Sequence, residues 1–127
     1  MSDLFVLTRT HAVRPARNMI EWAQFMSQHK KRIVEQTETK FHWVSTVFIG
    51  INYRFMGKGP PVVFETMTFA REHKIKEIFG RLMSIREEAD LDFGFGRWCF
   101  WDEALTGHHA IVGQVLRVEA KAEAMAP

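Results

Sequence analysis

Two neighbouring apolar segments, residues 41–55 and 62–69, constrain the fold of this chain more than any other feature. Both are rich in β-branched and aromatic residues, which favour strands. Between them, Met56–Pro61 contains two glycines and two prolines, residue types that form turns and stop strand pairing. The sequence therefore predicts a β-hairpin over about residues 41–69. Both faces are apolar between Val44 and Ile51, so we expect both to be covered, by helices or by a second subunit.

Three longer segments carry apolar residues at helical spacing. The first runs from about Ala16 to Gln36, the second from Arg71 to Asp90, and the third from about Trp101 to Ala122. Within the second, Gly80 costs about 1 kcal/mol relative to alanine. The third begins with acidic residues, which suit the positive end of a helix dipole, and the tail from about residue 120 is expected to fray.

Short strands at residues 4–7 and 97–100 complete the predicted elements. The predicted order is β-α-β-β-α-β-α. This is an α+β fold in which three amphipathic helices pack on an antiparallel sheet built on the central hairpin. A length of 127 residues suits one domain, residues 1–127, with a core that needs no metal or disulfide.

Composition excludes several classes of protein. The single cysteine, Cys99, leaves no internal disulfide and no zinc site of several thiolates. No apolar run is long enough to span a bilayer, and the first residues do not open a signal peptide, so we expect a cytoplasmic protein without a membrane partner. The net charge is only +2. Residues 1–58 hold nine Lys/Arg against four Asp/Glu, and residues 59–127 hold eight against eleven. This asymmetry suits an acidic partner or head-to-tail association, unless the two halves mix in space.

Three segments occur in the order and spacing of a known family. They are Val44–Gly50, Gly59–Met67 and Trp101–His108, with Met19–Ala23 at the matching distance upstream. Together they resemble a family of small proteins from bacteriophages and prophage-bearing bacteria to which no function is assigned. The resemblance covers most of residues 17–115. It implies a phage context, in the cytoplasm of a bacterial host cell, and no particular activity.

The chain departs from this family pattern in two places. Asn52-Tyr53 stands where the family more often has aspartate followed by histidine, so any metal or proton-transfer role of that pair is lost here. Residues 71–90 replace what is usually a short loop. The added segment suits either a partner surface specific to this chain or additional packing.

A few polar residues near the hairpin and the third helix are candidates for chemistry. Glu65 lies in a predicted strand and His108 in an apolar helical stripe, so a desolvated pair would form an acid–base unit, with His42 close by. The alternative is a structural tie between hairpin and helix. His108 and His109 point about 100° apart on a helix and cannot share a metal ion. No phosphate-binding loop or nucleophile elbow is present, so no catalytic residue, metal or cofactor is predicted beyond this pair.

Aromatic residues are numerous, with eleven Phe, four Trp and one Tyr. A dense group falls between residues 93 and 101, more than one side of a strand can bury. Its members are Phe93, Phe95, Trp98, Phe100 and Trp101, together with Arg97. Surplus aromatic residues are typical of interfaces, so we expect a homodimer contact or a partner surface here. Acidic residues flank the group and argue against nucleic acid as a direct ligand.

These observations favour an accessory protein of phage type that acts by binding a host or phage protein. A host defence or nucleic-acid-processing protein is the expected target, and an enzymatic role is disfavoured. The alternative is a small enzyme or a small-ligand sponge with a pocket around Glu65 and His108. A third interpretation is a structural component of the virion.

Overall fold

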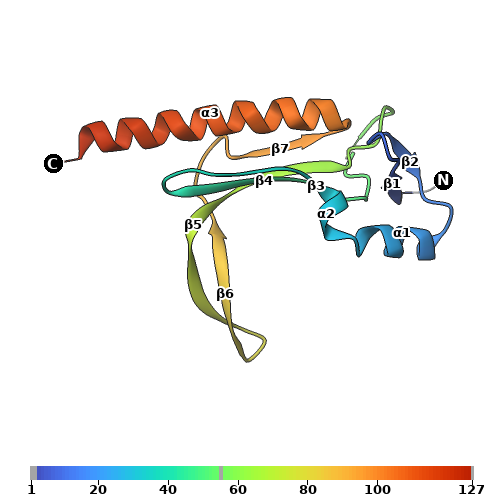
Figure 1. Cartoon of the computed structure of the whole chain (residues 1–127), viewed down its shortest axis with the longest axis horizontal. Helices are drawn as coiled ribbons and strands as arrows, with labels where there is room; N and C mark the ends of the chain where they lie inside the picture. The colour runs from blue at the N-terminus through green and yellow to red at the C-terminus, as the bar shows by residue number, and fades with distance from the viewer. Residues whose placement is uncertain (1–2, 55, 127) are drawn as a thin grey trace.

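The computed structural model describes residues 3–54 and 56–126, and its elements form one strongly bent sheet, a small hairpin and three helices (Figure 1). The elements in chain order are β1 (Phe5–Leu7), β2 (Val13–Pro15), α1 (Met19–Met26), α2 (His29–Arg32), β3 (Ile33–Glu38), β4 (His42–Phe48), β5 (Phe64–Ile78), β6 (Arg81–Glu88), β7 (Phe95–Trp98) and α3 (Trp101–Met125). The α+β class and the antiparallel sheet are confirmed, although the order of elements differs from the predicted one.

The larger sheet has the strand order β3-β4-β5-β6, and β7 also pairs with β5. All of its pairings are antiparallel. The predicted central hairpin is confirmed, since β4 and β5 pair from His42 opposite Ala70 to Phe48 opposite Phe64. Helix α3 lies across one face of this sheet and contacts β3, β4, β5 and β7. Strands β1 and β2 form a separate hairpin at the end of the sheet.

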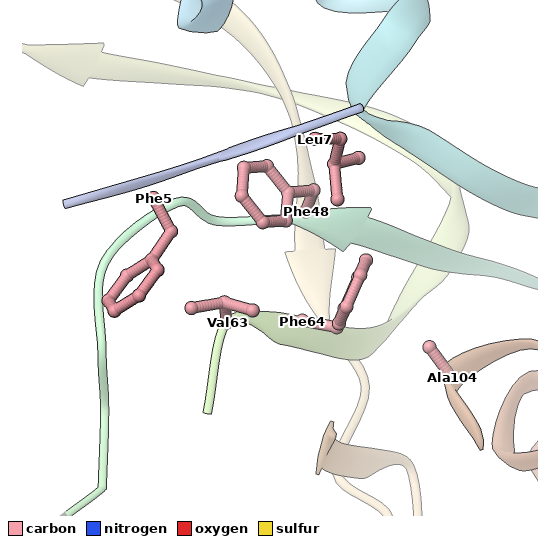
Figure 2. Close-up of a cluster of buried hydrophobic side chains, with 6 residues drawn as sticks. All are labelled: Phe5, Leu7, Phe48, Val63, Phe64 and Ala104. Carbon is pink, nitrogen blue, oxygen red and sulfur yellow. The ribbon is translucent and has the colours of Figure 1, made fainter. Parts of the chain in front are cut away.

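The apolar core lies where β1 meets the ends of β4 and β5 (Figure 2). Phe48 and Phe64 are fully buried and their rings meet edge to face at 5.3 Å. Phe25 of α1 adds a second edge-to-face contact, 5.7 Å from the Phe48 ring. Burial of such side chains contributes about 1.5–3 kcal/mol each. This cluster fixes the N-terminal elements on one end of the sheet.

The predicted helix from Ala16 to Gln36 is wrong in its length. The Asn18 side chain accepts a hydrogen bond from the Glu21 N–H and caps α1, which ends at Met26; the short α2 follows. Residues 33–38 form β3, paired with β4. The β-branched residues of this segment fit a strand, and pairing with β4 outweighs the weak helical periodicity.

The predicted strand over residues 41–55 is shorter, because β4 ends at Phe48. Gly50 takes a positive φ of 70°, and its carbonyl accepts a 3.0 Å hydrogen bond from the Trp22 indole N–H. A Cβ atom at this position would lie 2.7 Å from the Met26 sulfur. The chain therefore turns here, and the predicted strand end at Phe55 lies outside the described residues.

The predicted helix over residues 71–90 is also wrong. Strand β5 continues to Ile78, and β6 returns along it after the two-residue turn Phe79-Gly80. Both turn residues have positive φ, 52° and 76°, as a type I′ hairpin turn requires. The apolar spacing of this segment fits a helix and a strand alike. In a helix Gly80 would be unfavourable, whereas in the hairpin it supplies the positive φ that the turn requires.

At the C-terminal end, the expected strand 97–100 appears as β7, two residues earlier, and the third predicted helix is confirmed as α3. The tail from about residue 120, for which the sequence predicts fraying, is helical as far as Met125. Its last turns contain Ala, Lys and Glu, which are good helix formers. Ion pairing of Lys40 with Glu123 also ties this end to the sheet. No helix among the described residues is both long and apolar enough to cross a membrane.

Candidate functional site

The centre of the interface between α3 and the sheet is polar. His108 is completely buried, and both of its ring nitrogens are hydrogen-bonded to threonine hydroxyls. The Nε2 atom lies 2.8 Å from Thr37 Oγ1, and the Nδ1 atom lies 2.8 Å from Thr46 Oγ1. The chain of hydroxyls continues to Thr66, which accepts a 3.0 Å hydrogen bond from the Trp98 indole N–H. His108 thus joins α3 to three strands of the sheet.

This histidine is held in its neutral form. Burial lowers the pKa of His108, because the charged ring would lose its hydration. Its two threonine partners satisfy a neutral imidazole, which donates through one nitrogen and accepts through the other. With no exposed surface, His108 cannot reach a substrate. It therefore acts as a structural tie, the alternative that the sequence left open.

A second polar cluster fixes the C-terminal half of α3. One oxygen of Glu119, Oε2, accepts hydrogen bonds from Thr39 Oγ1 at 2.6 Å and from the Phe41 backbone N–H at 3.1 Å, and it lies 2.6 Å from His42 Nδ1. Burial alone would raise the pKa of Glu119, but these hydrogen bonds together lower it. His42 therefore meets a carboxylate, but that carboxylate belongs to Glu119.

The predicted pair of Glu65 and His108 is not assembled. Thr46 and Thr66 point toward α3, where they hold His108, so the adjacent Glu65 points to the other face of β5. There its carboxylate accepts a 3.2 Å hydrogen bond from Arg97. The pocket expected around Glu65, His108 and His42 therefore has its members on different sides of the sheet.

The expected interface at residues 93–101 is divided between core and surface. Trp98 lies against Gly107, where a Cβ atom would come within 2.3 Å of its ring. Trp101 packs in the core cluster, and Phe93 packs against the second buried cluster, under α3. Only Phe95 and Phe100 keep about half of their surface exposed.

The sheet face opposite α3, here called the open face, carries apolar side chains that no helix covers in its middle (Figure 1). Alternation and register place on it Trp43, Val47, Glu65, Met67, Phe69, Phe95 and Arg97. Side chains of this face cover one another in part. The Arg97 guanidinium lies 4.5 Å from the centre of the Tyr53 ring and 5.2 Å from that of Phe95, and Arg86 lies 4.4 Å from that of Trp43.

Three of the most exposed apolar residues lie on the hairpin of β5 and β6. Its outer part, residues 73–86, is here called the arm, and it projects away from the body of the molecule (Figure 1). Phe79 at its tip is 100% exposed, Leu82 78% and Ile75 74%. Sequence reasoning missed this feature because it assigned the segment to a helix. A bulky residue followed by glycine, between two short apolar alternations, was the signal that could have revealed it.

Two further observations limit the chemistry. No group of three or more His, Cys, Asp or Glu side chains among residues 3–54 and 56–126 is arranged to hold a metal ion. Cys99 is half-buried, and its sulfur lies 3.7 Å from Arg54 Nη2 and from the Pro60 carbonyl oxygen.

Comparison of the chain with models of protein families, with curated proteins and with solved structures gives no match in any of the three.

Proposed function

We propose that this chain is an accessory protein of phage type that acts by binding a protein partner. The proposed contact surface is the arm together with the adjoining open face. The observation that carries the proposal is Phe79, an apolar ring that is fully exposed at the tip of a projecting hairpin. Soluble proteins rarely expose such groups in clusters unless another molecule covers them.

The backbone of the arm supports the same proposal. Strand β6 is the last strand of the sheet, so no other strand of the described chain pairs with its outer edge. An exposed edge with unpaired N–H and C=O groups readily accepts a strand from another chain. Ile75 and Leu82 lie on the same face of the arm and supply side-chain contacts beside that edge.

The partner class follows from the phage context that the sequence resemblance implies. We propose a host protein, in an inhibitory role toward a defence or nucleic-acid-processing function, inside the bacterial cytoplasm. A homodimer formed through the same surface is the second candidate. It is favoured by the apolar open face, which a second copy would cover.

Affinity purification from the host with matched variants tests the proposal. The double variant Phe79→Asp, Leu82→Asp places two negative charges on the arm, whereas Leu116→Asp places one negative charge at an exposed apolar position of α3. We expect the partner to be lost with the double variant and retained with the α3 control. Equal capture by the wild type and both variants would contradict the role of the arm.

A homodimer is distinguished by the molar mass in solution. If the arm and open face join two copies, the wild type elutes as a dimer of the 14.8 kDa chain and the double variant as a monomer. A monomeric wild type that captures a host protein supports the first candidate. A dimer that persists in the double variant and in Phe95→Asp would place the contact elsewhere.

A further inference from the structure

We propose a second binding site, independent of the arm, that takes a small organic anion: a carboxylate or phosphate group attached to a short apolar or aromatic body. The site is a surface cavity of about 330 Å³ between the β1–β2 turn and helices α1 and α2. It is lined by Leu7, Thr8, Arg9, His11, Phe25 and Lys31. This volume lies in the range of cavities that bind small molecules.

The polar part of the lining is cationic. Arg9 and Lys31 come from different elements and both line the cavity, which has no acidic residue in its wall. Neither side chain has a salt bridge or side-chain hydrogen bond among the described residues, although six of the chain's other Lys and Arg side chains are paired with Glu21, Glu38 or Glu87. A guanidinium and an ammonium that line the same cavity suit one oxyanion.

The apolar part of the lining is built from the core. Leu7 is buried in the core cluster, and Phe25 packs on it with its ring against Phe48. These side chains belong to fixed elements, so the cavity is present before a ligand binds. An aliphatic or aromatic body placed on them would lose contact with water while its charged group faces Arg9 and Lys31.

His11, one of the residues that line this cavity, has a strained backbone conformation. It has a positive φ of 66° in the tight turn that joins β1 to β2, a position where glycine is the favourable residue. Its ring stacks on Trp101 with a centroid distance of 3.6 Å and an angle of 10°. Non-glycine residues in this conformation cluster at functional sites. The strained turn places His11 in the lining of this cavity and in that of a second hollow, which also includes Trp101 and Asp102.

Titration calorimetry with phenyl phosphate and with benzoate tests the site, and phenol serves as the uncharged control. We expect one or both anions to bind and phenol not to bind, with the preferred anion revealing whether the natural head group is phosphate or carboxylate. Arg9→Gln and Lys31→Gln should each weaken binding roughly tenfold or more, the loss expected for a charge-assisted hydrogen bond. Arg81→Gln removes the same charge from the exposed start of β6 and should leave the affinity unchanged.

The variants His11→Gly and His11→Ala separate folding from binding. Glycine relieves the strained turn, so His11→Gly should keep its thermal midpoint within about 5 °C of the wild type. Both variants should bind the anion several-fold more weakly, because both lose the His11 imidazole. Wild-type affinity in His11→Gly, equal weakening by Arg9→Gln and Arg81→Gln, or binding of neither anion would overturn the proposal. Loss of the arm's partner is not expected in the variants of Arg9, Lys31 and His11, which lie outside the arm, so the two proposals fail separately.

Discussion

At the scale of single residues, two buried ionisable groups dominate the interface of α3 with the sheet. His108 is neutral and bonded to Thr37 and Thr46, and Glu119 is charged and bonded to Thr39, Phe41 and His42. Protonation of either group destabilises the fold. Their titrations nevertheless fall in different ranges of pH, which makes them experimentally separable.

Protonation of His108 destabilises the fold. Its pKa is lowered in the folded state, so the unfolded chain binds the proton first, and the free energy of unfolding falls as the pH drops below about 6.5. In His108→Gln this contribution disappears. Urea unfolding of both proteins between pH 7.5 and pH 5.5 measures it. Parallel decreases in the two proteins would contradict the assignment of a neutral buried His108.

Replacing His108 with alanine should cost about 2–5 kcal/mol, because the change leaves a cavity and two threonine hydroxyls without their partner. Exposed His109, next to it on α3, is the matched control and should cost less than about 0.5 kcal/mol. Denaturant unfolding at pH 7.5 gives both values. A small loss for His108→Ala would mean that the hydroxyls find water or each other.

Glu119 contributes in the acid range. Its pKa is lowered in the fold, so its stabilising contribution is present above the unfolded value of about 4.3 and is lost as the pH falls through the folded pKa. The difference in unfolding free energy between the wild type and Glu119→Gln should therefore shrink below about pH 4. Acid titrations followed by circular dichroism test this. A constant difference down to pH 2 would show that Glu119 is not the titrating group.

At the scale of elements, strong local signals could be predicted from the sequence and competing ones could not. Helix α3 and the hairpin of β4 with β5 carry long apolar patterns with clear turn or cap residues, and both were predicted correctly. The apolar spacing of residues 33–38 and of residues 71–88 fits both a helix and a strand. These segments are strands because residues 33–38 pair with β4, and because the outer part of β5 pairs with β6.

The candidate site follows the same division. The sequence could identify His108, His42 and Glu65 as polar residues in apolar surroundings. It could not tell their partners, because strand register alone decides which face of β5 each side chain occupies. The interface expected from the surplus of aromatic residues stays a prediction: Trp98 and Trp101 pack against the core, Phe95 and Phe100 are half-exposed, and the fully exposed ring of Phe79 lies outside the predicted group.

The turn of the arm is unfavourable for folding, and this supports its role in binding. Phe79 has a positive φ, a conformation that asparagine tolerates far better, and its ring makes no internal contact because it is fully exposed. We expect Phe79→Asn to stabilise the arm by up to about 1 kcal/mol while it abolishes partner capture. Amide hydrogen exchange of residues 73–86 measures the first effect. Faster exchange in Phe79→Asn would contradict this account of the turn.

At the scale of the whole molecule, the core and the arm divide stability from recognition. The two buried clusters include residues of β1, β4, β5 and α3, yet none from the outer arm, residues 73–86. Trp98 and the polar chain of His108 likewise lie on the body. The body therefore holds the contacts that fold the chain, and the arm extends from it at the far end of β5 (Figure 1).

Shortening the arm tests this division. Replacing residues 75–84 with Asn-Gly keeps Lys74 opposite Ile85 across a type I′ turn, the register that these residues already have. Because the removed side chains are nearly all exposed, the thermal midpoint should fall by no more than about 5 °C, and unfolding should remain cooperative. Partner capture should be lost together with the arm. If the arm-shortened protein unfolds, the body does not hold the contacts that fold the chain. If it folds and still captures the partner, the arm is not the contact surface.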